Sequence, residues 1–147
     1  MITVDSLFDN IIVYRSVVYM CKNVISIIVP CYNEEEMIPL FYDEIDKISQ
    51  EMNAITFEFI FVNDGSRDAT LDRLKELASR DARVRYYSFS RNFGKEAALY
   101  AGLVHSHGDY VAVMDVDLQD PPELLPEMYR LIQDEGYDCI GTRRKDR

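Results

Sequence analysis

The stretch "VISIIVPCYNEE", residues 24–35, decides how this chain is expected to fold. Its first six residues are a short apolar run that Pro30 stops, a pattern typical of a buried strand. The polar residues lead into a segment, about 35–52, whose apolar residues recur at i, i+4, i+7 and i+11 from Phe41. A buried strand followed directly by an amphipathic helix predicts the first half of a strand–helix–strand unit.

The same alternation repeats along the rest of the chain. Further apolar runs, each typical of a buried strand, lie at 57–62, 84–89 and 110–114, and another begins at 138–141. Segments with helical spacing separate them. Strands that alternate with amphipathic helices build a parallel sheet covered by helices on both faces. The sequence therefore predicts an α/β fold, a Rossmann-like three-layer sandwich with a mostly parallel sheet.

Cap residues and buried faces can be predicted for the later helices. Ser66 or Asp68 is expected to cap the helix after "NDGS". Asp120 is expected to cap another, with Pro122 at its first position. For the helix at 92–106, the residues expected on one buried face are Ala97, Tyr100, Ala101 and Val104.

The charge of the chain restricts its partners. The formal net charge is −10 over 147 residues. A general nucleic-acid binder is excluded, because phosphate backbones require a basic surface. A single bound nucleotide is not excluded, since a metal ion can offset its charge locally.

Cysteine usage and hydropathy suggest a cytoplasmic protein. The number of cysteines is odd and their spacing is not that of a metal finger, which predicts a reducing compartment. No apolar stretch approaches the roughly 20 residues that a membrane helix needs. The segment "IIVYRSVVYM" at 11–20 is interpreted as neither a signal peptide nor an anchor. We divide the chain into an N-terminal extension, 1–22, whose status the sequence leaves open, and one domain, 23–147.

Polar residues follow each predicted strand at the point where the strand ends. Open α/β sheets bind ligands outside the carboxyl ends of their strands, so these four segments are expected to converge on one site. The residues singled out are Pro30, Tyr32 and Glu34 after the first strand, Asp64 after the second, Gly94 and Lys95 after the third, and Asp115 after the fourth.

The last of these segments, "VMDVDLQDPPE" at 113–123, suggests a metal site. Asp115 and Asp117 share a face if the segment is extended, and Gln119 continues the spacing. Carboxylate and amide oxygens suit Mg²⁺ or Mn²⁺, which commonly bridge protein carboxylates and substrate phosphates. The alternative is a solvated acidic turn.

Less specific alternatives remain open for the other residues. Asp64 could accept hydrogen bonds from a base or ribose, or the Asp-Gly pair could simply form a turn. Tyr32 could stack on a base or lie at the edge of the core. Gly94 and Lys95 open a helix and could hold an anion, or the lysine could be solvated. The whole chain could instead be a non-catalytic module that self-associates through an exposed sheet edge.

Five segments of the chain form a recognisable set: "SIIVPCYNEEE", "FVNDGSRDAT", "SRNFGKEAAL", "MDVDLQDPPE" and "GTRR". Together they resemble family 2 glycosyltransferases with the GT-A fold. The closest resemblance is to the polyprenyl-phosphate branch, with its dolichyl-phosphate mannose synthase-like and bactoprenol glucosyltransferase-like enzymes. It covers roughly residues 24–144.

This resemblance implies a function and assigns roles to residues. Pro30, Tyr32, Glu34 and Asp64 would hold the nucleotide, with Gly94 and Lys95 beside it. The ligands of Mg²⁺ or Mn²⁺ on the diphosphate would be Asp115, Asp117 and Gln119. The implied reaction is an inverting transfer of a sugar from a UDP- or GDP-sugar to a polyprenyl phosphate.

The resemblance also implies that part of the enzyme lies elsewhere. In family members the acceptor-binding half, with the usual catalytic carboxylate and arginines, follows the point that corresponds to Arg147. The chain is thus expected to be the nucleotide-sugar-binding part, weakly active or inactive alone. The full-length protein is expected at the inner face of the membrane.

Overall fold

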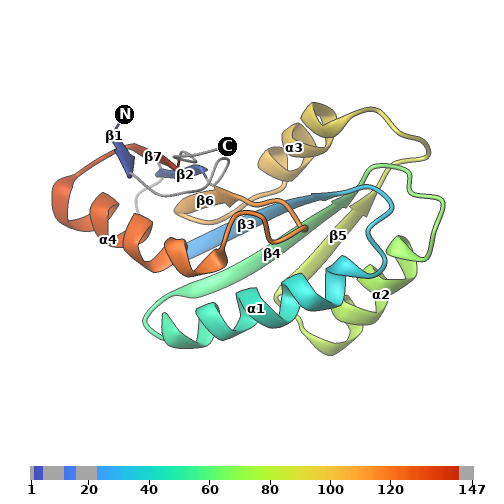
Figure 1. The fold of residues 1–147 in the computed structure, drawn as a ribbon, viewed down its shortest axis with the longest axis horizontal. Coiled ribbons are helices and arrows are strands. Elements are labelled where there is room, and N and C mark those ends of the chain that lie inside the picture. Colours follow the sequence, from blue (N-terminus) through green and yellow to red (C-terminus); the bar gives the residue numbers. More distant parts are fainter. Residues whose placement is uncertain (1, 5–11, 16–22, 143–147) are drawn as a thin grey trace.

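The computed structural model describes residues 2–4, 12–15 and 23–142, which form a seven-stranded sheet flanked by helices (Figure 1). Cys21 and most of the N-terminal extension lie outside the described residues. The strands are β1 (Ile2–Val4), β2 (Ile12–Arg15), β3 (Val24–Cys31), β4 (Thr56–Asn63), β5 (Val84–Ser88), β6 (Tyr110–Val113) and β7 (Cys139–Thr142).

The sheet has the order β1-β7-β2-β6-β3-β4-β5 in the described part of the chain. Neighbouring strands from β6 to β5 are parallel, whereas β2 is antiparallel to both β6 and β7. The prediction of a mostly parallel sheet is confirmed. Two short pieces of the N-terminal extension join the sheet as β1 and β2, which the sequence did not predict.

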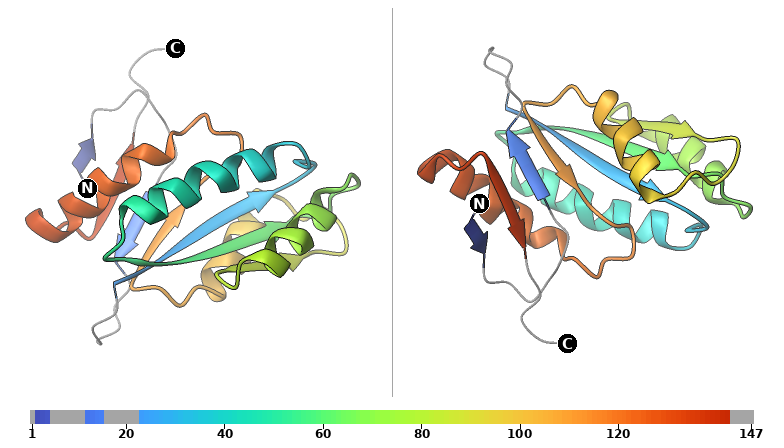
Figure 2. Two further views of the ribbon diagram at one scale, coloured as in Figure 1. Left: turned by 90° about the horizontal axis from the view of Figure 1, so that it is seen from below. Right: turned by 90° about the horizontal axis from the view of Figure 1, so that it is seen from above.

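The helices form a layer on each face of the sheet. They are α1 (Met37–Glu51), α2 (Thr70–Arg80), α3 (Lys95–Val104), the short 3-10 helix η1 (Pro122–Leu124) and α4 (Leu125–Glu135). Helices α1, α2 and α4 cover one face, and α3 lies on the other (Figure 2). The α/β three-layer prediction is confirmed. No helix among the described residues is long and apolar enough to cross a bilayer.

The strand order explains why α3 lies apart from the other helices. The chain steps from β3 to β4 to β5 in one direction, and α3 then returns it past β3 to β6. Right-handed crossovers put their helices on opposite faces when the direction reverses. The sheet therefore has a switch point between β3 and β6, where a ligand crevice is expected.

The main core lies between the sheet and the layer of α1, α2 and α4. Alternate residues of β3 and β4 point into it, and among its fully buried side chains are Phe41, Phe59 and Phe61. The rings of Phe41 and Phe61 meet edge to face at 6.2 Å. Burial of each such ring contributes about 1.5–3 kcal/mol. The other face holds only a small buried cluster, of Ile60, Val62 and Ala98, so the α1 side supplies most of the hydrophobic stabilisation.

The face predicted for α3 is wrong. Ala98 and Gly102 are its buried residues, whereas Tyr100 and Val104 are 71% and 59% exposed. A Cβ on Gly102 would lie 2.3 Å from Cγ2 of Ile28, so the helix approaches the sheet too closely for a larger side chain. Small residues therefore face the sheet, and the large apolar ones face outward.

Two predicted helix starts also need correction. Ala69 is the N-cap residue of α2, and Ser66 instead accepts a hydrogen bond from the amide of Asn33 at 2.9 Å. Asp68 does lie at the start of α2, where its Oδ1 accepts the amide of Thr70 at 3.1 Å. Pro122 opens η1, with Pro121 as N-cap residue, and α4 begins only at Leu125. Pro122 shapes the turn before α4.

An ion-pair network on the α1 side of the sheet gives the first prediction. Arg83 Nη2 lies 2.5 Å from both Asp81 Oδ2 and Asp46 Oδ1, and Tyr42 also donates a hydrogen bond to Asp81. The hydrogen bonds from Arg83 lower the pKa of Asp81 from 3.8 to about 2. A carboxyl whose pKa is lower in the folded state stabilises the fold when ionised, and that contribution is lost as the pH falls through the folded pKa.

Asp81→Asn is expected to lower the free energy of unfolding at pH 7 by about 1–2 kcal/mol. The difference should shrink below about pH 4 and be only a small fraction of its pH 7 value near pH 2, where about half of the wild-type carboxyls are protonated in the folded state. Urea unfolding at both pH values measures it. Asp72→Asn, at a position 77% exposed on α2, is the control and should change little. An equal loss at both pH values would contradict the ionic origin.

Candidate functional site

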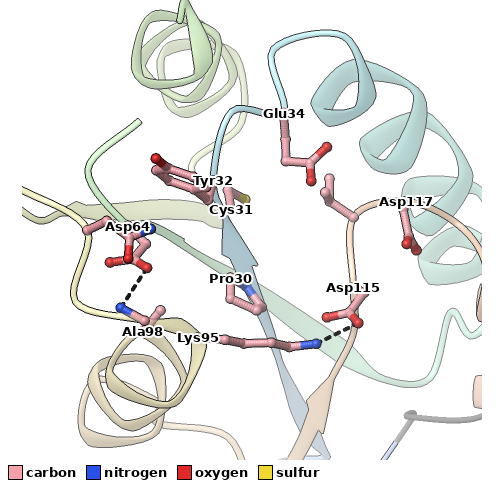
Figure 3. A pocket seen from close by; sticks show the side chains of 12 residues that line it. Pro30, Cys31, Tyr32, Glu34, Asp64, Lys95, Ala98, Asp115 and Asp117 are labelled. Atoms are coloured by element: carbon pink, nitrogen blue, oxygen red, sulfur yellow. Dashed lines mark hydrogen bonds and ion pairs between the residues drawn. The ribbon is translucent and has the colours of Figure 1, made fainter. Parts of the chain in front are cut away.

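A pocket of about 430 Å³ opens at the carboxyl ends of β3 and β6, at the switch point of the sheet (Figure 3). Its walls come from four segments that are distant in sequence. The lining residues are Pro30, Cys31, Tyr32, Glu34, Asp64, Asn92, Gly94, Lys95, Ala98, Asp115, Val116 and Asp117.

The structure brings together nearly all residues that the sequence singled out. Of the predicted set, only Gln119 is absent from the pocket lining, and it is exposed. Tyr32 is 43% exposed, so it lies at the pocket rather than in the core. The convergence of the four loops is therefore observed, while the ligand-binding role of each residue stays a prediction.

Gln119 is displaced because the segment after β6 is not extended. The chain turns at residues 116–119, and Leu118 has a left-handed φ of 57°. The amide of Gln119 donates to Oδ1 of Asp117 at 3.1 Å, which closes the turn. In the view of Figure 3, the side chains of Asp115 and Asp117 leave the chain on different sides. The expected shared face of three ligands is wrong for this conformation.

The loop after β3 is held to the loop after β4 by side-chain hydrogen bonds to backbone amides. Asn33, at a left-handed φ of 56°, accepts the amide of Arg67 at 2.9 Å. Glu35 accepts the amide of Ala69 at 2.7 Å, and Thr70 accepts that of Glu34 at 2.8 Å. These polar residues hold the two loops together. In the loop after β3, the residues that line the pocket are instead Pro30, Tyr32 and Glu34, with Cys31.

Asp64 ties the loop after β4 to the start of α3. It is buried, and its two carboxylate oxygens accept the amides of Phe93 and Gly94 at 2.7 and 2.9 Å. The adjacent Gly65 has φ +68°, and a Cβ there would lie 2.2 Å from the carbonyl carbon of Arg91. Asp64 and Gly65 together fix where α3 begins, and hence where Lys95 lies.

Negative charge dominates the pocket. The described lining residues carry four carboxylates, on Glu34, Asp64, Asp115 and Asp117, and one ammonium, on Lys95. Lys95 Nζ lies 2.7 Å from Oδ2 of Asp115. Burial, and after it the charges of Asp117, Asp68 and Asp115, raise the pKa of Glu34. Such crowding favours binding of a cation.

The pocket residues fit a divalent metal in part. Asp115 and Asp117 are hard oxygen ligands at the pocket, and Mg²⁺ often takes only one or two protein carboxylates and fills its shell with water and substrate phosphates. Among residues 2–4, 12–15 and 23–142, no group of three histidine, cysteine or carboxylate side chains could hold a metal alone. Asp115 and Asp117 line the pocket from different sides of the chain, and Mg²⁺ beside a diphosphate needs only one protein carboxylate, whereas Gln119 lies outside the lining in this arrangement.

Three lining residues were missed by the sequence reasoning, Cys31, Ala98 and Val116, while Asn92 lies among the polar residues after the third predicted strand but was assigned no role. Cys31 is buried, and burial together with the charges of Glu34 and Asp115 raises the pKa of its thiol, which makes it a poor nucleophile. Ala98 lies one helical turn beyond Gly94 and Lys95, so helical spacing could have indicated it. Val116 gave no separate signal.

Most of the chain matches the sequence model of a known protein family. A sequence model described as "Glycosyl transferase family 2" matches residues 26–147. The chain belongs to glycosyltransferase family 2. The match includes every strand-end segment that lines the pocket.

Similar sequences and solved structures agree with this family. The bactoprenol glucosyl transferase of Shigella phage SfV is 48% identical over 123 residues, 84% of this chain and 39% of that protein. The prophage bactoprenol glucosyl transferase homolog of Escherichia coli strain K12 is 46% identical over 123 residues, 84% of this chain and 40% of that protein. This family 2 domain thus spans about 39% of the length of the curated relatives it matches.

A solved neighbour is the mannosyltransferase PcManGT from Pyrobaculum calidifontis in complex with GDP-Man and Mn²⁺. It has a TM-score of 0.64 and 25% identity, covering 76% of this chain and 32% of that one. Staphylococcus aureus TarS 1-349 in complex with UDP has a TM-score of 0.54 and 24% identity, over 71% and 32% of the two chains. The latter supports the fold alone.

Proposed function

We propose that this family 2 domain is the donor-binding part of an enzyme that takes a sugar from a UDP- or GDP-sugar. The observation that supports this best is the pocket at the reversal between β3 and β6, which gathers Tyr32, Asp64, Lys95 and Asp115 from four separate loops. The names of the relatives support glucose as the sugar and a polyprenyl phosphate as the acceptor.

In the proposed reaction, an acceptor phosphate oxygen forms a bond to the anomeric carbon. The bond from that carbon to the diphosphate breaks on the opposite side, which inverts the anomeric configuration and releases a nucleoside diphosphate. Lys95 and the N-terminus of α3 offer positive charge to the leaving diphosphate. A divalent ion held by Asp115 and Asp117, when bound, would add Lewis-acid stabilisation of the same leaving group.

The acceptor also bears on where the reaction takes place. A polyprenyl phosphate is a membrane lipid, whereas a nucleotide sugar is water-soluble. The proposed location of the full-length protein is therefore the cytoplasmic face of a membrane. Fractionation of cells that express it would test this, since its recovery entirely free of membranes would argue against the location.

Titration calorimetry with UDP, GDP and their glucose and mannose conjugates tests the donor proposal. We expect one nucleotide class to bind with a heat that depends on Mn²⁺ or Mg²⁺. EDTA should abolish that heat. The proposal is wrong if none of these compounds gives a metal-dependent heat with the folded chain.

A second candidate is a non-catalytic module that self-associates. The outward face of α3 favours it, because Tyr100, Leu103 and Val104 expose apolar surface there, and β5 is an edge strand of the sheet. Light scattering over a hundredfold range of concentration separates the candidates. A monomer throughout that range would argue against the module.

A further inference from the structure

Lys95 already holds one of the carboxylates that the proposed function assigns to a metal. It begins α3, and its side chain extends across to Asp115 after β6 (Figure 3). Its ammonium nitrogen lies 2.7 Å from Oδ2 of Asp115. A divalent ion that binds Oδ2 would displace the ammonium, and one that binds the other oxygen, Oδ1, would lie close enough to repel it.

The charge balance of the pocket indicates that the displaced ammonium would pair with the diphosphate. Four carboxylates and one ammonium leave three net negative charges on the described lining residues. A nucleoside diphosphate alone would enter against this charge, while the ammonium is engaged by Asp115. A metal ion alone would have to leave the ammonium without a partner. Bound together, the metal takes the carboxylate and the diphosphate takes the ammonium.

We infer that Lys95 is an exchangeable cation, which holds Asp115 in the empty pocket and moves to the diphosphate when a divalent metal takes its place. The inference rests on the proposed function and adds to it that Lys95, by changing partner, couples the binding of the metal to that of the nucleotide. The coupling is reciprocal, so each raises the affinity of the other by the same factor. Typical factors of this kind are about 5- to 150-fold.

A lysine in this position suits an exchange. Its side chain is 51% exposed, and the ammonium is a point charge on a flexible stem that can reorient between partners. Ion pairs this exposed contribute little to the stability of the fold, so a metal can break the Lys95–Asp115 pair at a small cost in free energy. Asp64 keeps the first turn of α3 in place, which lets the ammonium move while the backbone stays.

Lys95→Gln tests the inference, because it removes the competing cation. Binding of Mn²⁺ alone should become about two- to fivefold tighter, since an exposed ion pair no longer opposes it. Binding of UDP or GDP at saturating Mn²⁺ should become about tenfold weaker, since a charge-assisted contact is lost. Electron paramagnetic resonance of free Mn²⁺ and titration calorimetry measure the two affinities.

Lys75→Gln is the matched control. Lys75 is also 51% exposed and pairs with Asp72 at 2.9 Å, but it lies on α2 and does not line the pocket. Both affinities should stay unchanged. In the wild-type chain the ¹³Cε signal of Lys95 gives a second measurement: it should shift when Mg²⁺ alone is added and shift again when the diphosphate follows.

The outcomes separate the inference from the proposed function. The inferred exchange is wrong if Lys95→Gln binds Mn²⁺ alone no more tightly than wild type, or if the ¹³Cε signal of Lys95 does not shift when Mg²⁺ is added. The proposal of metal-dependent nucleotide binding would not be affected by either result. A purely structural lysine would weaken both affinities, and a simple phosphate contact would weaken only the nucleotide. If the wild-type chain binds no nucleotide with Mn²⁺, both proposals fail.

Discussion

Asp115→Asn is expected to weaken Mn²⁺-supported binding of UDP or GDP by about 100-fold or more, equivalent to roughly 2.8 kcal/mol. Asp115 and Asp117 are the pocket carboxylates that we propose as metal ligands, and an amide oxygen without charge is a much weaker partner for a divalent ion. The substitution also releases Lys95 from its pair. Calorimetry at fixed Mn²⁺ measures the loss.

The fold should tolerate this substitution. The Lys95–Asp115 pair is half exposed on the lysine side, and such pairs contribute about 0–1 kcal/mol, so urea unfolding should change little. Asp134→Asn on α4 is the matched control, since it removes the same charge from an exposed carboxylate that pairs with Arg130. If Asp115→Asn keeps wild-type binding with its Mn²⁺ dependence, Asp115 is not a ligand.

The Gln119→Ala variant tests whether Gln119 is a metal ligand, as the sequence predicts, or lies outside the site, as the structure indicates. An extended segment would make Gln119 a third ligand, and its loss would then weaken metal-supported nucleotide binding about tenfold. The turn at residues 116–119 instead keeps it out of the pocket lining, so we expect less than about a threefold change. A tenfold loss would show that this turn rearranges when ligands bind.

The strands and the position of the site could be predicted because their signals are local. An apolar run such as "VISIIV" needs only its own residues and Pro30 to indicate a buried strand. Once parallel strands are inferred, all their carboxyl ends lie at one edge, so residues as distant as Tyr32 and Asp115 must converge. Pattern and topology therefore gave most of the pocket lining without any knowledge of side-chain contacts.

The missed features depend on contacts between segments that the sequence does not pair. The buried face of α3 follows from the closeness of Gly102 to Ile28, which no helical periodicity shows. The turn after Asp115 depends on a left-handed Leu118, an uncommon conformation for a non-glycine residue. Asn33 and Glu35 belong to the polar segment after β3, and no local pattern shows that their side chains hold two loops together.

Asp64 gives the second large prediction, because its observed contacts give it a structural role beside the nucleotide-binding role that the resemblance implied. Both its oxygens accept backbone amides at the start of α3, in a buried position. In Asp64→Asn one amide would face an NH₂ group instead of an acceptor. We expect the free energy of unfolding, measured in urea without nucleotide, to fall by about 1.5–3 kcal/mol.

Hydrogen exchange locates this loss and distinguishes the two roles of Asp64. The amides of Phe93 and Gly94 should exchange faster in Asp64→Asn than in wild type, because they lose a carboxylate acceptor. Asp109→Asn is the control, since Asp109 accepts the amide of Val24 at 3.0 Å and should leave those two amides unchanged. If Asp64→Asn instead keeps full stability and protection but loses nucleotide affinity, the carboxylate acts by direct contact with the nucleotide. Loss of both stability and affinity would mean that Asp64 acts by holding the start of α3, and with it Lys95, in the position that the diphosphate requires.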